Sequence, residues 1–454
     1  MKRSDFRYVE MAAVLRTEIL SGYLKPGQYL LPETELCRKY SISRNSLRQA
    51  LELLTEEGHL VRMRGRGNRV AEPIGAKPDE TNTIVVLSPY RSSYAEEGLP
   101  MLIAAFNKEH PNVEVKLLYT GYLVDTIMRD LTGLGMKPDI VLAWDRHFCE
   151  FDAKEFVPLG GLVTDWADIP EKLIGAFSKQ GEPYAVPVTY SPVFLACNPH
   201  LFEEAGVHMP VVGWTLEQFV EAAKRLTRDT DGDGMCETYG FGLSGSSIRW
   251  PVLAMKYGYR KRIGEDGRLR TDELEQAFAF FQRLLYTERI TPVSGVGDWV
   301  FLNELFEEGK LAMILTTTLA MPDKRHHFPM RVLPLPRNEG APIGSLMIAN
   351  GFMLSRSSPN PELAGRFIQF ALDYDYQKNM ARQTGFLSVY DSVNRSVWTP
   401  YERNVLGIDP EHFEDAQFIH ELFPAGVKPK ELEQLMKKFW AGLESPRDVL
   451  NRMF

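Results

Sequence analysis

Apolar residues recur at helical spacing through the first seventy residues of the chain. One stripe, formed by Tyr8, Met11, Ala12, Leu15 and Ile19, predicts a helix over residues 5–21. A shorter pattern predicts a helix over 33–40. A second long stripe, at positions 47, 50, 51 and 54, predicts a helix over 44–57 with Ser43 as its N-cap. Two extended runs, 59–63 and 68–71, then predict a hairpin around a glycine-arginine tip.

The polar face of the 44–57 helix gives this first unit a candidate function. Its side chains can hydrogen-bond to phosphates or to base edges, and they are Arg44, Asn45, Ser46, Arg48 and Gln49. The plain alternative is a solvated charged helix face, which is common in small helical domains. The hydrogen-bonding groups on this face make nucleic-acid binding the candidate function to weigh against that alternative.

The pattern changes after residue 72. Residues 73–82 hold two prolines and a glycine and predict a linker. Buried or alternating strands at 83–88, 113–118 and 138–143 then alternate with helices at 99–109 and 125–131, which predicts an α/β domain with a largely parallel sheet. Region 185–198 reads as extended, and Thr215 with Gln218 predicts a capping box for a helix over 215–226. Further helices are expected at 272–286, 300–309, 361–372, 374–382, 429–442 and 446–453.

Length and charge support this division. A chain of 454 residues exceeds one hydrophobic core, so two or three domains are expected. The net charge is −8, but residues 1–75 hold 13 Lys+Arg and 9 Asp+Glu, a net of +4. The remainder holds 39 and 51, a net of −12, so the basic part is the predicted DNA reader.

The remaining composition points to a cytoplasmic protein. Four scattered cysteines (Cys37, Cys149, Cys197 and Cys236) form no C-x-x-C pair and suit a reducing compartment. The N-terminus lacks the uninterrupted apolar stretch of a signal peptide, and no eighteen-residue apolar run is present. We therefore expect no membrane partner.

The first unit resembles the winged helix-turn-helix of the GntR family of bacterial regulators. The lead-in Ile19 to Gly27, the pairs Ser43-Arg44, Leu47-Arg48 and Ala50-Leu51, and the Gly65-x-Gly67 wing fall in register. Two positions depart from the family: Pro32 comes one residue late, and Thr34 stands where a DNA-contacting Arg or Asn is frequent. The resemblance implies a DNA-binding domain over 1–72, with Arg44, Asn45, Ser46 and Arg48 toward the major groove. It also implies Thr34 as a groove-facing position and a wing tip made of Arg64, Gly65, Arg66 and Gly67.

Region 83–454 resembles the family 1 extracellular solute-binding proteins of ABC importers. The resemblance is carried by the stretches from Ile103 to Val115, Gly181 to Val207, Trp214 to Thr227, Phe306 to Met313 and Gln383 to Ser388, where Ser388 replaces the usual proline. It implies a two-lobed α/β fold of the periplasmic-binding-protein type (type II) that closes on a solute, often a saccharide. Aromatic planes and short polar groups suit a sugar, so the candidate ligand residues are Tyr90, Trp144, Asp145, Tyr190, Trp250, Trp299 and Thr317. For each aromatic residue, a place in the core is the alternative.

An acidic loop follows the 215–226 helix. Asp229, Asp231 and Asp233 occupy positions 1, 3 and 5 of a calcium-loop spacing, and Glu237 occupies position 9. The twelfth position, where such loops need a bidentate Glu, is Gly240. The loop is thus a candidate for structural calcium or a turn that exposes its acids. No cofactor is otherwise required.

Catalytic motifs are absent from the sequence: it has no P-loop, no G-x-S-x-G and no H-E-x-x-H. We therefore expect a ligand-responsive transcription regulator, not an enzyme, that binds paired half-sites of a DNA operator as a homodimer. The apolar stripe of the 429–442 helix is either a dimer surface or a docking face. An importer-type solute receptor, or a regulator whose sensor lobe binds a protein partner, is the alternative.

Overall fold

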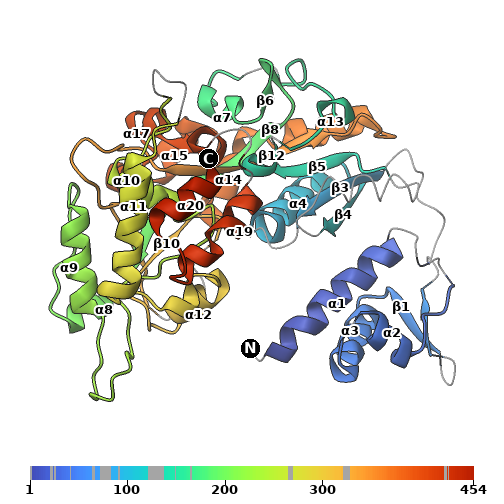
Figure 1. Ribbon diagram of the computed structural model, residues 1–454. Helices are drawn as coiled ribbons and strands as arrows, with labels where there is room; N and C mark the ends of the chain where they lie inside the picture. Colours follow the sequence, from blue (N-terminus) through green and yellow to red (C-terminus); the bar gives the residue numbers. More distant parts are fainter. Residues whose placement is uncertain are drawn as a thin grey trace.

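The computed structural model describes residues 3–20, 24, 27–40, 42–63, 67–71, 83–89, 93–120, 137–148, 150–163, 166–263, 269–320, 328–423, 427 and 429–454. Several predicted features lie outside these residues, namely the linker 73–82, the helix expected at 125–131, Tyr90, and the wing-tip residues Arg64, Gly65 and Arg66. The described parts form a small N-terminal unit and a large two-lobed unit (Figure 1). No helix in the described part of the chain is long and apolar enough to cross a membrane.

The small unit is a three-helix domain with a hairpin. Its elements are α1 (Arg3–Leu20), α2 (Glu33–Lys39), α3 (Arg44–Glu56), β1 (Leu60–Met63) and β2 (Gly67–Val70). The predicted stripes meet in its core, because Met11, Leu15, Leu47 and Leu54 are almost fully buried together. Arg16 of α1 binds Glu57 at the end of α3 through a 2.6 Å ion pair. Helix α1 also lies against strand β4 of the large unit.

The N-lobe of the large unit is built on a mixed sheet of order β13-β12-β5-β3-β4, with β8 paired to β12. Its strands are β3 (Thr83–Pro89), β4 (Glu114–Thr120), β5 (Ile140–Trp144), β8 (Val186–Pro192), β12 (Leu346–Leu354) and β13 (Gln417–Phe418). The strands β3, β4 and β5 are parallel as predicted, but β12 runs antiparallel to β5 and to β8. The expectation of a largely parallel sheet therefore holds for the pairings β3–β4, β3–β5 and β12–β13, and it is wrong for the two pairings that β12 makes with β5 and β8. The reason is that β12 enters the N-lobe from the opposite direction, after the chain has built the other lobe.

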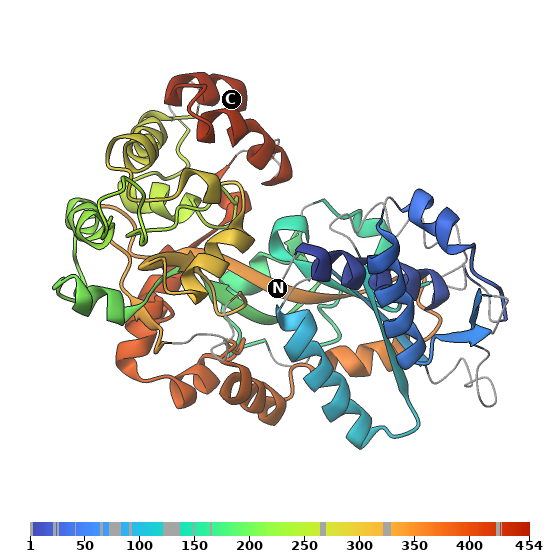
Figure 2. The ribbon, with the colours of Figure 1, turned by 90° about the horizontal axis from the view of Figure 1, so that it is seen from below.

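Helices cover this sheet on both sides (Figures 1 and 2). The N-lobe elements are η2 (Tyr94–Gly98), α4 (Leu99–Glu109), α6 (Asp145–Phe148), η3 (Ala153–Glu155), α7 (Glu171–Gly175), a small hairpin β6 (Ser178–Lys179) and β7 (Glu182–Pro183), α13 (Pro361–Phe370), α14 (Tyr374–Thr384) and α15 (Asp391–Val397).

The C-lobe carries a three-stranded antiparallel sheet of order β10-β9-β11. Its elements are β9 (Phe194–Cys197), α8 (Pro199–Glu204), α9 (Leu216–Leu226), α10 (Pro251–Tyr257), α11 (Asp272–Gln282), η4 (Arg283–Thr287), η5 (Val293–Gly295), α12 (Trp299–Glu307), β10 (Met313–Thr316), β11 (Arg331–Leu333), α16 (Pro400–Leu406), α17 (Pro410–Asp415), α18 (Ile419–Leu422), α19 (Pro429–Trp440) and α20 (Pro446–Met453). The capping box predicted for α9 is present, with Thr215 and Gln218 each accepting the other's backbone N–H.

The C-terminal helix α19 docks on its own lobe. Leu432, Met436 and Phe439 of its stripe are at most 1% exposed, in one core with α10 and α11. The stripe is therefore a docking face. A dimer surface on the same residues would require this helix to leave its core.

Two strands carry the chain between the lobes. β8 ends at Pro192 in the N-lobe sheet, and β9 begins at Phe194 in the C-lobe sheet. β12 begins beside this crossing, where the Val193 N–H donates to the carbonyl of Leu346 at 2.8 Å. The two connections lie side by side, so the lobes share a hinge of paired strands.

Candidate nucleic-acid and ligand sites

Helix α3 presents its polar face to solvent. Ser43 caps it, its Oγ accepting the Ser46 N–H at 3.1 Å. Arg44, Asn45 and Arg48 are exposed on this helix, and Thr34 is exposed on α2. All four side chains are thus accessible to a binding partner.

Ser46 departs from the prediction. It is 3% exposed, and its hydroxyl lies 2.9 Å from the Ser43 hydroxyl, inside the cap. A side chain held there cannot reach a base edge without breaking the helix start, so Ser46 is a structural residue of the turn. The same helix spacing that placed Arg44 and Arg48 outward turns position 46 toward the core.

Arg48 forms an ion pair with an acid of the preceding helix. Its Nε lies 2.9 Å from Glu33 Oε2 of α2, and its side chain is 61% exposed. The pair joins the two helices across the turn. A phosphate or a base approaching Arg48 competes with this carboxylate.

The wing is broader than the predicted hairpin. β1 and β2 pair antiparallel, with Met63 opposite Gly67, and the φ of +91° at Gly67 places it in the region that favours glycine. The segment before α2 adds a third line of pairing, because Val70 donates to Gln28 and Leu30 donates to Asn68, each at 2.9 Å. The lead-in thus fixes the hairpin from one side.

Several predicted ligand residues meet where the two lobes join. Asn350 of β12 lies opposite Trp144 of β5 on one side and Thr189 of β8 on the other, which brings Trp144 and Tyr190 to the same end of the sheet. Thr318, next to Thr317 in the C-lobe, donates its backbone N–H to Ser191 Oγ at 2.9 Å. The structure therefore brings together Trp144, Asp145, Tyr190 and Thr317.

Asp145 is a buried acid on the N-lobe side of this junction. It is 1% exposed, and its Oδ1 accepts the Ala349 N–H of β12 at 2.8 Å. Its Oδ2 has no hydrogen-bond partner among the described residues. Burial is the largest cause that raises the pKa of Asp145 to about 7, against the lowering effect of the Ala349 N–H and of Arg146.

Trp144 is a half-buried aromatic plane with two neighbours. The Arg146 guanidinium lies 4.4 Å from its ring centroid, a cation–π distance, and the His147 ring stacks at 5.3 Å. Burial and the charge of Arg146 lower the pKa of His147 to about 3, so this imidazole is neutral. Three hydroxyls at the end of β10, those of Thr316, Thr317 and Thr318, are buried without hydrogen-bond partners among the described residues.

Tyr190 and Trp250 are packing residues in this conformation. The Tyr190 ring is 3% exposed and meets Phe413 edge-on at 5.4 Å, and burial raises the pKa of its phenol. Trp250 is fully buried in the C-lobe core, against the aromatic rings of Phe278, Phe281, Phe423 and Trp440. The interpretation of Trp250 as a sugar platform was wrong for this reason, since no face of its ring is open. Trp299 is 41% exposed at the first position of α12.

Two residues that the sequence analysis passed over stand beside those it chose. Arg146 follows Trp144-Asp145, and Arg249 precedes Trp250. Arg249 is 6% exposed, and burial together with the charge of Arg146 holds its pKa below the usual range for arginine. Trp250, the predicted ligand residue of the Arg249-Trp250 pair, is a core residue, and Arg249 beside it forms a 3.0 Å hydrogen bond from Nη1 to the Ile248 carbonyl.

The carboxylate oxygens of the acidic loop lie close together. Oxygens of Asp229, Asp231, Asp233 and Glu237 lie within 4.8 Å of one another, and all four residues are exposed. Backbone amides already serve several of them, with Gly232 donating to Asp229 Oδ1 at 2.6 Å and Met235 donating to Asp233 Oδ1 at 2.7 Å. A side chain at Gly240 would put a Cβ 2.0 Å from the Ala223 carbonyl, so no glutamate fits the twelfth position.

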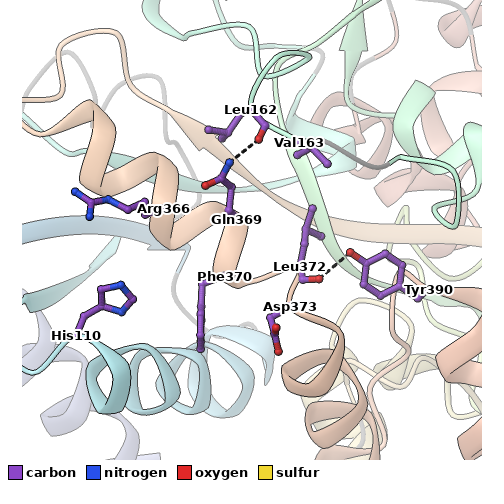
Figure 3. Close-up of a pocket in the computed structure, with 9 residues that line it drawn as sticks. All are labelled: His110, Leu162, Val163, Arg366, Gln369, Phe370, Leu372, Asp373 and Tyr390. Atoms are coloured by element: carbon purple, nitrogen blue, oxygen red, sulfur yellow. Dashed lines mark hydrogen bonds between the residues drawn. The ribbon is translucent and has the colours of Figure 1, made fainter.

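A pocket of about 410 Å³ lies on the N-lobe (Figure 3). It is lined by His110 at the end of α4, by Leu162 and Val163, and by Arg366, Gln369 and Phe370 of α13, with Leu372, Asp373 and Tyr390. Two of its polar groups are paired within the lining, because Gln369 donates to Leu162 O and Tyr390 donates to Leu372 O, each at 2.7 Å. None of the predicted ligand residues lines it.

Fold and sites together define a two-lobed solute-binding protein with a winged helix-turn-helix at its N-terminus. The family model of bacterial extracellular solute-binding proteins matches residues 92–378, and that of the gntR family of bacterial regulatory proteins matches residues 7–70. The chain belongs to the bacterial extracellular solute-binding protein family and carries a GntR-type DNA-binding domain. Neither is a family of enzymes.

Relatives fall into the same two groups. A binding protein of Brucella abortus is 24% identical over 326 residues, which cover 68% of this chain and 75% of the relative. The arabinose metabolism transcriptional repressor of Geobacillus stearothermophilus is 27% identical over 145 residues, 29% of this chain and 38% of the repressor.

Solved structures share the fold of the large unit. An ABC substrate-binding protein of Listeria monocytogenes, in complex with cycloalternan, superposes with a TM-score of 0.68 at 19% identity, over 82% of this chain and 96% of that one. Maltose-bound MalE3 of T. maritima gives the same TM-score at 18% identity, over 82% and 97%.

Proposed function

We propose that the protein is a ligand-responsive transcription regulator, in which a solute closing the two lobes changes how the winged domain binds an operator. The observation that carries the proposal is the presence, in one chain, of an exposed Arg44-Asn45-Arg48 face on a capped helix and of a two-lobed solute-binding fold. A protein that binds a chromosomal operator works in the cytoplasm.

The ligand site of the proposal lies at the hinge. Trp144 supplies an aromatic plane, and Asp145 Oδ2 with the Thr316–Thr318 hydroxyls supplies polar atoms that have no hydrogen-bond partner within the described part of the chain. Aromatic planes and unpaired hydrogen-bonding groups are what a saccharide needs. Saccharides occupy the solved relatives in complex with cycloalternan and with maltose, which supports this class of ligand.

The coupling follows from where the winged domain is attached. The linker leads into β3 of the N-lobe, and Asn360 holds the first residue of that strand by donating to Thr83 O at 3.0 Å. A ligand that binds the closed lobes more tightly than the open ones shifts the population toward closure. In a homodimer, closure would change the spacing of two winged domains on paired half-sites.

Selection of DNA from a random library by the full-length protein tests the proposal. The expected result is a motif with two related half-sites, bound with an affinity that changes when the activating solute is added. Binding that shows no sequence preference would refute the regulator and leave a solute receptor.

A further inference from the structure

The N-lobe pocket of about 410 Å³ has the size of a small-molecule site, for which volumes of about 300–1,000 Å³ are usual. The Gln369 side chain of α13 donates to the Leu162 carbonyl at 2.7 Å, which ties the 162–163 segment to this helix. The apolar wall between them is therefore fixed by the packing of the lobe. It is formed by Leu162, Val163, Phe370 and Leu372.

Three aromatic rings line the same pocket, and they belong to His110, Phe370 and Tyr390. The His110 ring stacks on the fully buried Phe106 with the centroids 4.2 Å apart, and Phe370 meets Phe106 edge-on at 5.5 Å. Tyr390 is fixed by its hydroxyl, which donates to the Leu372 carbonyl at 2.7 Å. Rings that are already held in place favour a flat, aromatic ligand, because they lose little freedom when it binds.

One end of the pocket carries positive charge. Figure 3 shows Arg366 and His110 on the same side of Phe370. The exposed Arg366 guanidinium forms no hydrogen bond or ion pair with another residue in the described part of the chain. Its planar fork of N–H donors fits a carboxylate. His110 Nδ1 donates to the Phe106 carbonyl at 3.2 Å, so Nε2 is the ring nitrogen left for a ligand.

The acid of the pocket does not neutralise this charge. Asp373 caps α14, and its Oδ1 accepts the Tyr376 N–H at 2.8 Å. Figure 3 places Asp373 on the other side of Phe370 from Arg366, and no ion pair joins the two within the described residues. An anionic group on a ligand therefore finds its counter-ion in Arg366.

We propose that this pocket binds an aromatic carboxylic acid, whose ring packs against the apolar wall and whose carboxylate binds Arg366. Such a ligand is separate from the solute at the hinge and adds a second input to the proposed regulator. The two helices that it joins meet the sheet where the winged domain is attached. Helix α13 begins directly after Asn360, which holds the Thr83 carbonyl, and α4 leads through a short turn at His110 into β4, against which α1 lies.

Calorimetric titration of the full-length protein with three probes tests this site. Phenylacetate supplies the ring and the carboxylate, phenylacetamide lacks the charge, and acetate lacks the ring. Phenylacetate should bind the wild type, and the other two should bind at least about tenfold more weakly, because each loses one of the two contacts.

Arg366→Gln removes the charge at an exposed position, so the variant should fold as the wild type does and bind phenylacetate at least about tenfold more weakly. Arg382→Gln on α14 is the matched control, because Arg382 is also an exposed helix arginine without an ion pair among the described residues. It should keep the wild-type affinity for phenylacetate.

Hydrogen exchange on the wild type then locates the ligand, and this readout and the comparison of probes decide the matter without any variant. Phenylacetate should slow exchange in α13 and leave α6, beside the hinge, unchanged.

Four results overturn the proposal. They are wild-type affinity of Arg366→Gln for phenylacetate, equal binding of phenylacetamide and phenylacetate, protection of α6 in place of α13, and no binding of phenylacetate up to about 10 mM. None of them bears on the selection of an operator, so the proposed function is tested separately.

Discussion

The Arg48–Glu33 pair makes the proposed DNA interface testable by two substitutions. If Arg48 reads a base, Arg48→Ala should cost roughly 1–3 kcal/mol on the selected operator, about 5- to 150-fold in affinity. The wild-type arginine must first leave Glu33, 2.9 Å away. An exposed pair contributes about 0–1 kcal/mol, so that amount is subtracted from the contact with DNA.

Glu33→Gln removes the competing carboxylate and keeps the shape of the side chain. It should tighten operator binding by up to about fivefold, because Arg48 no longer exchanges one anionic partner for another. In the Arg48→Ala background, Glu33→Gln should tighten operator binding much less, since its effect acts mainly through Arg48. The difference between the two backgrounds is the coupling energy of the pair.

Fluorescence anisotropy on the selected operator and on a scrambled duplex, at two salt concentrations, measures all four proteins. Arg395→Ala is the control, because this arginine is 56% exposed and pairs with Asp391 at 2.6 Å, far along the chain in α15. It should change neither affinity. Equal losses for Arg48→Ala on both duplexes would refute base reading and leave a phosphate contact, and a weaker-binding Glu33→Gln would refute competition by the carboxylate.

Three further predictions concern the large unit. Burial raises the pKa of Asp145 from 3.8 to about 7. Between these two pH values the folded state holds a proton that the unfolded state releases. The free energy of unfolding should therefore fall as the pH rises from about 4 to 7, by about 4 kcal/mol in all. Urea unfolding across that window should show the fall in the wild type and not in Asp145→Asn, and identical profiles would contradict it. Trp250→Ala should destabilise the C-lobe by roughly 3–5 kcal/mol, as expected for a core aromatic residue. Trp144→Ala should keep the fold and lose the ligand-induced rise in melting temperature. Unfolding of Trp144→Ala would count against the role of Trp144 as a ligand platform. Millimolar Ca²⁺ should raise the melting temperature slightly by binding the 229–237 loop, and Asp231→Asn should abolish that rise. Unfolding of the protein when Ca²⁺ is chelated would instead mean that the ion, and not the hydrogen bonds within the loop, holds the loop in place.

Local rules predicted the elements whose causes are local. Helix α3 has its cap at Ser43 and a stripe at helical spacing, and helix α9 has the Thr215–Gln218 capping box, so both were placed within a residue or two. Strand β12 was missed, because Leu346–Leu354 is buried almost throughout and its pairing with β5 and β8 joins segments about 150 to 200 residues apart. No alternation marks such a strand.

The candidate site residues were likewise predicted where their position depends on local spacing and missed where it depends on distant segments. Outward positions on α3 followed from helical spacing, except that the cap turned Ser46 inward. In the ligand region the residue type misled, because Trp250 fills a core together with the rings of Phe278, Phe281, Phe423 and Trp440. Sequence alone cannot tell that this ring is covered, because the rings that cover it come from segments later in the chain.

The late arrival of β12 also sets the order in which the protein can mature. The described residues between 3 and 71 form the core of the winged domain from contacts among themselves, so this core can fold as soon as it leaves the ribosome. The N-lobe sheet begins at Thr83 but lacks its central strand until residue 354 has been made. At 5–20 residues per second, that delay is on the order of tens of seconds. During that interval a nascent chain already carries a finished DNA reader beside a sensor with open strand edges, so chaperone binding at β5 and β8 would protect it from aggregation before it can respond to any solute.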